Sequence, residues 1–263
     1  PLENSVSILG ASEFKVAITS DQDCGQIIVR LCDVSPSGSS KRISYGVLNL
    51  AMRNGLDCPK LVVAGEVMNV SIKLDDTGYQ IPVGHRLRLA VSSAYFPLIW
   101  PAPKKAKLTL DLASSCLTIP CHDRSATLVR DLGQGYVCPV KKTKKIRPEK
   151  HDRVIQTDAR DGLVTTKIND DFGEFTFVEH NLTVGESCNE THSILPDDPY
   201  SASSECCWHS HQSRPGWNVN VYTQLKVICD AEYFYLNSSI EALENGVQIH
   251  QSQSQEKLPR GFS

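Results

Sequence analysis

Three observations predict an all-β fold. Apolar and polar residues alternate with a period of two over most of the chain, helical stripes of period 3.6 are scarce, and turn residues such as Asp161-Gly162 and Asn245-Gly246 separate the alternating runs. The 263 residues are enough for two domains with a core each, at about 100 to 200 residues per domain. We place the domains at 1–125 and 151–263, joined by a basic linker over 126–150.

The first 125 residues are expected to form an antiparallel sandwich of about eight strands. Alternating or short apolar runs predict strands over 14–19, 26–31, 44–50, 67–74, 86–92, 107–112 and 116–119. In the fifth of these, Leu87, Leu89 and Val91 share one face. We therefore predict that this face is buried and that the opposite face carries Arg86 and Arg88.

The second domain is expected to be an up-and-down antiparallel sheet, because Asp-Gly and Asn-Gly tolerate the positive φ of tight hairpin turns. Predicted strands cover 153–157, 163–168, 173–178, 181–195, 201–210, 218–230, 233–244 and 247–251. Two alternatives stay open: closure of the meander into a barrel-like domain that encloses a small apolar ligand, and a helical turn over 238–244.

The charge is distributed unevenly among the 27 basic and 30 acidic residues of the chain. Residues 141–150 hold six basic residues, one acidic residue and a proline, and are too polar to be buried, so we interpret them as part of a solvated linker. No aromatic residues interleave with these lysines and the following domain is acidic, which argues against nucleic acid as a partner. No window approaches the roughly 18 apolar residues of a membrane span, and no signal peptide pattern is present, so no membrane partner is expected.

The ten cysteines are spread thinly and do not indicate a disulfide framework. Four N-glycosylation sequons lie at Asn69, Asn181, Asn189 and Asn237. They would suit a secreted protein, but such triplets also occur by chance. The compartment therefore stays open between cytoplasm and secretion. The run from Cys206 to His211 offers thiol and imidazole ligands for zinc. Adjacent cysteines point to opposite faces of a strand, however, and no second ligand pair has the right spacing, so we predict no metal and no other cofactor.

Familiar catalytic motifs are absent from the sequence. There is no Gly-x-Ser-x-Gly for a serine nucleophile. Glycine patterns for phosphates or dinucleotides, His-Glu-x-x-His and the calcium-loop pattern are missing as well. We therefore predict no catalytic residue in this chain.

The most specific pattern lies between residues 61 and 103. It includes Tyr79-Gln80-Ile81-Pro82-Val83-Gly84-His85-Arg86 and Tyr95-Phe96-Pro97-Leu98-Ile99-Trp100-Pro101, and it continues upstream in 29–38 and 46–50. These residues resemble the C-terminal jelly-roll region of the CocE/NonD serine hydrolases, a family of cocaine esterase, X-prolyl dipeptidyl aminopeptidase and alpha-amino acid ester hydrolase. The resemblance covers residues 1–121, whereas 150–260 resemble only weakly the tail of some larger bacterial members.

The resemblance implies a galactose-binding-like jelly roll over 1–125 that follows an α/β-hydrolase domain with a helical cap. It implies that Ser, Asp and His of a serine esterase or dipeptidyl-peptidase lie upstream or on a separate chain, so this chain alone is expected to be inert. The chain begins with Pro1 instead of Met, as expected of a fragment or a processed product. The partner that the resemblance implies is the hydrolase domain, because the jelly roll of this family forms part of the wall of its substrate cleft. The term galactose-binding-like describes the architecture and does not imply sugar binding.

Two groups of residues are candidates for the cleft or the domain interface. Arg86 and Arg88 could pair with carboxylates of a neighbouring domain, with a solvated face as the alternative. Tyr95, Phe96 and Trp100 are expected to form a stiff aromatic loop at one end of the sandwich, with closure of the core as the alternative. A second function class stays open, a carbohydrate-binding module in which these rings stack on sugars.

Overall fold

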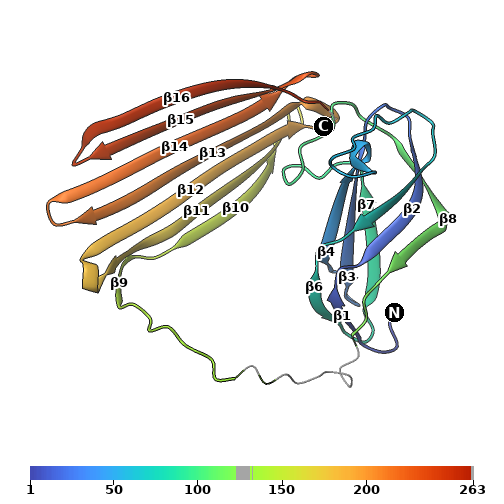
Figure 1. Cartoon of the computed structure of the whole chain (residues 1–263), viewed down its shortest axis with the longest axis horizontal. Coiled ribbons are helices and arrows are strands. Elements are labelled where there is room, and N and C mark those ends of the chain that lie inside the picture. The colour runs from blue at the N-terminus through green and yellow to red at the C-terminus, as the bar shows by residue number, and fades with distance from the viewer. Residues whose placement is uncertain (123–130, 132, 262–263) are drawn as a thin grey trace. The chain divides into compact units, whose positions relative to one another are not determined.

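β-Strands make up nearly all of the regular structure in the computed structural model, which describes residues 1–122, 131 and 133–261 (Figure 1). The all-β prediction is confirmed. Among the described residues, the helical elements are the short 3-10 helices Leu50–Met52 and Val178–His180. None of the helices there has the length and hydropathy needed to cross a membrane. The chain divides into a first unit that ends at residue 132 and a second unit over 133–261.

The described residues of the first unit form eight strands: Val6–Gly10 (β1), Glu13–Ser20 (β2), Gln26–Val34 (β3), Ser40–Asn49 (β4), Met68–Lys73 (β5), Thr77–Ile81 (β6), Arg86–Ser92 (β7) and Leu108–Thr118 (β8). They pair in the orders β5-β2-β8, β4-β3-β7 and β1-β6, and every pairing is antiparallel. The predicted antiparallel arrangement is therefore confirmed for this unit.

One apolar core lies between the sheets β5-β2-β8 and β4-β3-β7. Alternate residues of the strands fill it, because successive side chains of a strand point to opposite faces. The strands β2, β3 and β5 contribute Phe14, Val16, Ile18, Ile27, Val29, Leu31, Met68, Val70 and Ile72, all at most 5% exposed. Leu87, Leu89 and Val91 of β7 pack against this cluster as the alternation predicts, so Arg86 and Arg88 belong to the outer face.

The strands β4 and β5 approach each other closely at Gly46. A Cβ at this position would lie 2.5 Å from the carbonyl oxygen of Lys73, so a side chain cannot be accommodated without movement of the backbone. Next to it, the hydroxyl of Ser44 donates to the carbonyl oxygen of Asp75 (2.6 Å), and the Asp75 N–H donates to that of Tyr45 (2.9 Å). These contacts join the two sheets along one edge.

Two details of the first unit differ from the prediction. The segments 107–112 and 116–119 belong to one strand, β8, whose register against β2 shifts between Asp111 and Cys116. The strands β1 and β6 were not predicted. They pair with each other, with Val6 opposite Ile81 at one end and Gly10 opposite Thr77 at the other.

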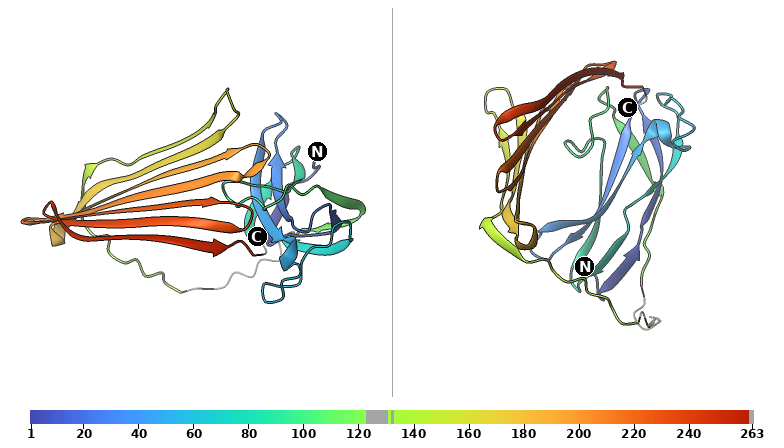
Figure 2. Two further views of the ribbon diagram at one scale, coloured as in Figure 1. Left: turned by 90° about the horizontal axis from the view of Figure 1, so that it is seen from above. Right: turned by 60° about the vertical axis from the view of Figure 1, so that its left-hand side comes forward.

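The second unit is one antiparallel sheet of eight strands: Thr143–Arg147 (β9), Lys150–Thr157 (β10), Val164–Phe177 (β11), Leu182–Leu195 (β12), Asp198–Arg214 (β13), Trp217–Cys229 (β14), Tyr233–Glu244 (β15) and Val247–Pro259 (β16). The strands β10 to β16 pair in chain order, and β9 pairs with β11. Figure 2 shows them as a single twisted layer. The predicted meander is confirmed. In the described part of the chain, β10 and β16 do not pair with each other, so the sheet stays open and is not a barrel.

The turns of this sheet follow the predicted dipeptides. Asn245 and Gly246 have φ angles of 50° and 79°, as a type I′ hairpin turn requires. The helical alternative for 238–244 is wrong, because these residues lie in β15 and pair with both β14 and β16. The segments 163–168 and 173–178 fall in one strand, β11, with a bulge between Asp171 and Glu174.

The basic segment interpreted as a linker contains a strand. Thr143–Arg147 forms β9 and pairs with residues 174–177 of β11, although all five of its side chains are exposed. These residues are therefore part of the second sheet. Their backbone N–H and C=O groups pair with β11 even though no apolar side chain is buried. Residues 126–130 and 132 of the predicted linker lie outside the described residues.

Few side chains of the second sheet are buried. Its buried hydrophobic residues, among those described, are Cys188, Ala202 and Cys229. A sheet needs a second layer to cover either of its faces. The second unit therefore depends on strand pairing and cross-strand contacts more than on a core.

Candidate functional site

The outer face of the sheet β4-β3-β7 carries four arginines, Arg30, Arg42, Arg86 and Arg88. The register places Arg42 and Arg88 on the two sides of Cys32 of β3. Arg42, Arg86 and Arg88 are exposed, and Arg30 is half-buried. We call these four residues and their sheet neighbour Tyr45 the arginine face.

The arginine face has no counter-ion among the residues that the structure describes. Within the described residues, none of its four guanidinium groups forms an ion pair with a carboxylate. The Nε atom of Arg30 is buried and has no hydrogen-bond partner among the described residues. The hydroxyl of Ser92, on the same sheet face, is also buried and also lacks a partner among them. A buried donor without an acceptor costs about 1 to 3 kcal/mol.

Tyr95 is anchored on the arginine face. The guanidinium carbon of Arg30 lies 4.9 Å from the centroid of its ring, and that of Arg42 lies 5.7 Å away. Arg42 also donates a hydrogen bond to the Tyr95 hydroxyl, and Tyr45 contacts the ring edge to face at 6.3 Å. Cation–π contacts of this kind contribute about 0.5 to 1 kcal/mol each at exposed sites. The sequence analysis singled out Tyr95 but neither Arg30 nor Arg42.

Phe96 and Trp100 form a second aromatic pair, with ring centroids 5.8 Å apart in an edge-to-face arrangement. Gln26 of β3 donates to the carbonyl oxygen of Trp100 at 3.1 Å, which ties the segment to the sheet. Both rings are half-buried, and neither belongs to the core cluster of the sandwich. Leu98, between them, is 52% exposed.

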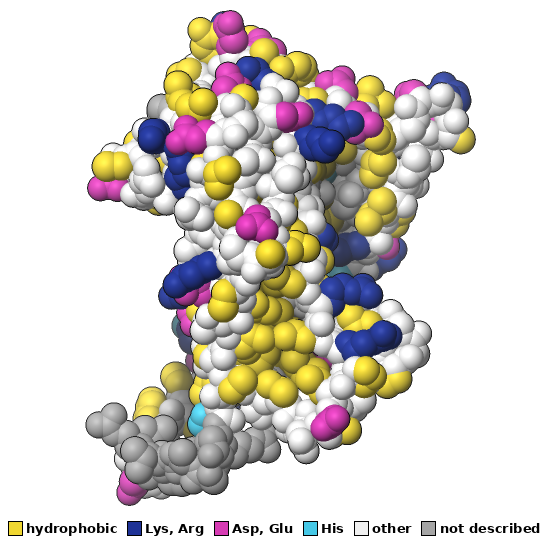
Figure 3. Space-filling view, turned by 90° about the vertical axis from the view of Figure 1, so that its right-hand side faces the viewer, with side chains coloured by type: hydrophobic (Ala, Val, Ile, Leu, Met, Phe, Trp, Pro, Cys, Tyr) yellow, Lys and Arg dark blue, Asp and Glu magenta, His cyan; other side chains and the backbone are white. Residues whose placement is uncertain are grey.

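Apolar side chains also reach the surface elsewhere. Figure 3 shows hydrophobic side chains gathered on one face of the molecule, with Lys and Arg side chains close by. Where the first unit is described, its exposed large hydrophobic residues are Leu9, Val47, Leu56, Leu61, Val63, Val67, Val83, Leu98 and Leu112. Of these, Val47 of β4 shares the outer sheet face with the arginines.

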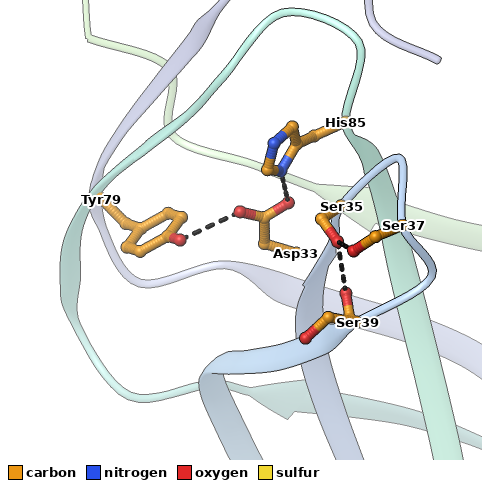
Figure 4. A network of polar contacts seen from close by, with 6 residues as sticks. All are labelled: Asp33, Ser35, Ser37, Ser39, Tyr79 and His85. Atoms are coloured by element: carbon orange, nitrogen blue, oxygen red, sulfur yellow. Dashed lines mark hydrogen bonds and ion pairs between the residues drawn. The ribbon is translucent and has the colours of Figure 1, made fainter.

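A polar network lies at the end of β3 (Figure 4). Asp33, only 5% exposed, contacts Nδ1 of His85 at 2.8 Å and accepts a hydrogen bond from the Tyr79 hydroxyl at 3.0 Å. Burial and, after it, the hydrogen bond to Asp33 raise the pKa of Tyr79. The hydroxyl of Ser35 bonds to Ser37 and to the backbone of Ser39 instead of to the imidazole.

The network therefore does not form a serine triad. A triad needs a serine hydroxyl hydrogen-bonded to the imidazole nitrogen that faces away from the carboxylate. Among the described residues no hydroxyl occupies that place at His85. The Asp33–His85 pair instead fixes the entrance of β7 beside the arginine face.

Comparisons with known proteins identify a family for the first part of the chain. Residues 1–155, more than half of the chain, match the family described as X-Pro dipeptidyl-peptidase C-terminal non-catalytic domain. An Xaa-Pro dipeptidyl-peptidase of Streptococcus pneumoniae serotype 19F (strain G54) is 33% identical over 106 residues, which are 40% of this chain and 14% of that protein. The chain thus spans only a small part of the length of this relative.

Two solved structures are similar at low identity. An alpha-amino acid ester hydrolase is 19% identical with a TM-score of 0.44 and is matched over 46% of this chain and 24% of that one. A CocE/NonD family hydrolase from Staphylococcus aureus is 13% identical with a TM-score of 0.40, over 46% and 29% of the two chains. On the match over residues 1–155, the chain belongs to the family of X-Pro dipeptidyl-peptidase C-terminal non-catalytic domains.

Proposed function

We propose that this chain is the non-catalytic C-terminal region of a serine acyl hydrolase of the esterase or Xaa-Pro dipeptidyl-peptidase type. In this proposal the arginine face docks on an α/β-hydrolase domain, and the aromatic segment beside it helps to shape the substrate cleft. The family supports the first part, because its domain is non-catalytic and lies C-terminal to a hydrolase domain in full-length enzymes. The observation that carries the second part is that, over the described part of the chain, no carboxylate forms an ion pair with the arginine face.

Arginine suits such an interface. Its planar guanidinium group forms two parallel hydrogen bonds with a carboxylate and is more weakly hydrated than an ammonium group. Arg86 and Arg88 stand two residues apart on β7, with Arg42 across β3 from Arg88, so acidic side chains of one partner surface can reach all three. Exposed Val47 and Leu98 add apolar area, and tyrosine and arginine are enriched in interface cores.

The carbohydrate-binding alternative has less support. Sugar rings stack on an aromatic ring that offers an open face, but a guanidinium group already lies over Tyr95. Phe96 and Trp100 contact each other edge to face and are half-buried. We therefore favour the domain-docking function.

The test supplies the hydrolase domain of the parent protein in trans. This chain alone is expected to leave p-nitrophenyl esters and Xaa-Pro amides unchanged. With the hydrolase domain, it should form a complex, measured by calorimetry, and should raise the rate of hydrolysis. The double charge reversal Arg86→Glu with Arg88→Glu should weaken binding on the order of 100-fold, because each glutamate would face an acidic partner surface.

The matched control is Lys73→Glu, since Lys73 is an exposed cation on β5 of the opposite sheet. It should leave binding within about twofold of wild type, as is usual for an exposed charge outside an interface. Absence of a complex, or equal losses for the two charge reversals, would contradict the docking proposal.

A further inference from the structure

The strands β12 and β13 of the second sheet bring two cysteines and a glutamate to one face. Glu190 lies directly opposite Cys206 in the antiparallel register, and Cys188 shares the face of Glu190 because the two are two positions apart. The sulfur atoms of Cys188 and Cys206 are 3.6 Å apart. Cys188 is 3% exposed, which is unusual in a sheet that buries few side chains.

The separations fit the corners of a metal-binding tetrahedron. Oε1 of Glu190 lies 3.8 Å from the sulfur of Cys188, and one ligand atom from each of the three residues lies within 4.8 Å of the others. Zinc–sulfur bonds of about 2.3 Å and zinc–oxygen bonds of about 2.0 to 2.2 Å place tetrahedral ligands about 3.5 to 3.8 Å apart. An ion at the centre would therefore need only small side-chain movements.

A histidine holds the carboxylate in this position. Nε2 of His192 lies 3.0 Å from Oε2 of Glu190, the oxygen that does not face Cys188, and Nδ1 lies 2.8 Å from the hydroxyl of Ser204. The His192 side chain is only 12% exposed. Contacts of this kind around a metal ligand fix its orientation and strengthen binding.

The cluster has the charge character of a cation site. Once deprotonated, it would hold two thiolates and a carboxylate whose ligand atoms lie within 4.8 Å of one another. A divalent cation would compensate this charge and displace the thiol protons on binding.

We propose that Cys188, Cys206 and Glu190 bind one zinc ion, with His192 as a positioning residue and water in the fourth place. Two thiolates select a soft or borderline ion such as zinc over magnesium or calcium. All four residues lie outside the matched range 1–155, so the zinc site is independent of the proposed docking function. The sequence analysis predicted no metal, because adjacent cysteines point to opposite faces and no second ligand pair has the right spacing. It missed this site because its ligands come from two paired strands.

The experiment uses the full chain, stripped of metal and kept reduced, and titrates it with Co²⁺ as a spectroscopic substitute for zinc. We expect one equivalent to bind with thiolate-to-cobalt charge transfer and visible bands of a tetrahedral site, and Zn²⁺ to abolish both. Cys188→Ser and Cys206→Ser should each lose the charge-transfer band. The matched control Cys207→Ser should keep it, because Cys207 neighbours Cys206 but points to the other face.

The positioning role of His192 is tested by affinity. His192→Ala should bind Co²⁺ about 10- to 100-fold more weakly with the charge-transfer band retained, an effect that a purely structural role would not produce in a correctly folded variant. Far-ultraviolet circular dichroism checks that each variant folds. If Cys188→Ser does not fold, the Cys206→Ser variant provides the test, because Cys206 is only half-buried. Lack of a charge-transfer band in the reduced wild type would overturn the proposal. So would equal bands in the Cys206→Ser and Cys207→Ser variants, or recovery of a Cys188–Cys206 disulfide with no metal uptake after reduction.

Discussion

Nδ1 of His85 lies 2.8 Å from Oδ1 of Asp33, and the second oxygen of the same carboxylate accepts the hydrogen bond of Tyr79. One buried carboxylate thereby joins β3 to β6 and to the entrance of β7. The backbone of His85 in turn accepts a hydrogen bond from Leu2 at 2.8 Å. The network holds the strand that carries Arg86 and Arg88, so its integrity matters for the arginine face as well as for stability.

Removal of this carboxylate should destabilise the first unit. Asp33→Ala leaves two polar side chains without their partner in a largely buried place, and we expect a loss of about 1 to 3 kcal/mol in the free energy of unfolding. Urea unfolding at neutral pH measures it. Asp76→Ala, at an exposed position in the β5–β6 turn, is the control and should stay within about 0.5 kcal/mol of wild type. Equal effects of the two substitutions would show that the network contributes nothing.

The raised pKa of Tyr79 has a consequence at alkaline pH. Because burial and Asp33 raise the pKa above the ordinary value of 10.0, the folded state binds this proton more tightly than the unfolded state. The stabilisation is therefore complete below pH 10 and is lost as the pH rises through the folded-state pKa. Ultraviolet titration of tyrosinate, as a difference between wild type and Tyr79→Phe, should show a late-ionising tyrosine. In Asp33→Asn that ionisation should move to lower pH; an unchanged titration would refute the assignment.

The close approach of β4 and β5 makes Gly46 intolerant of a side chain. In Gly46→Ala the new Cβ would meet the carbonyl oxygen of Lys73 at 2.5 Å, and overpacking of this kind costs about 1 to 3 kcal/mol. Gly78→Ala in β6 is the matched control, because the nearest atom to its Cβ is a side-chain carbon of Leu9 at 3.8 Å. Thermal unfolding should show a loss for the first variant only.

Asp230 should stabilise the turn after β14 in a pH-dependent way. Hydrogen bonds from the Tyr235 hydroxyl and from the N–H groups of Glu232 and Tyr233 lower the pKa of its carboxyl below the ordinary 3.8. The contribution is therefore present above pH 3.8 and disappears as the pH falls through the folded-state pKa. The stability difference between wild type and Asp230→Ala, followed by urea unfolding from neutral to acidic pH, should shrink over that range. A constant difference would mean that the carboxylate charge is irrelevant there.

Docking through the arginine face should depend on salt. Charged groups at an interface rim steer association, and salt screens them over about 10 Å at 0.1 M. Affinity for the hydrolase domain should thus fall as ionic strength rises, and the fall should be smaller for the variant with Arg86→Glu and Arg88→Glu. Calorimetry at several salt concentrations measures both slopes. Equal slopes would indicate that other contacts hold the complex.

Strand positions could be predicted wherever one face is apolar. Leu87, Leu89 and Val91 alternate without interruption, and β7 has the bounds that this pattern predicts. Strands whose side chains do not alternate between apolar and polar were either missed or predicted too short. β9 is lysine-rich and wholly exposed, and β16 runs to Pro259 although the prediction ended at residue 251.

Irregularities in a strand misled the prediction in a different way. Asp111 accepts hydrogen bonds from the Ala113 N–H and the Ser114 hydroxyl, and this local polar structure resembles a turn in the sequence. The strand β8 continues through it. The same holds for β11 at the bulge near Gly173.

The candidate sites could be predicted only in part, since a sequence gives the face of a residue within its own strand but not its neighbour on the next. Period-two alternation was enough to place Arg86 and Arg88 together. That Arg30 and Arg42 lie on the same face as Arg86 and Arg88 follows only from the register of β3, β4 and β7. The proximity of Cys188 and Cys206 likewise follows from the pairing of β12 with β13, which no spacing in the sequence reveals.

Strand β16 is the last strand of the second sheet, and all thirteen of its residues are exposed. Among the strands that the structure describes, β16 pairs with β15 alone, so a strand from a second molecule can pair with its other edge. The stretch 247–255 carries no Asp, Glu, Lys or Arg to oppose this, and Glu256, Lys257 and Pro259 stand only at its far end. Self-association in concentrated solution is therefore expected to start at this strand, and it is where a solubilising charge would be most effective.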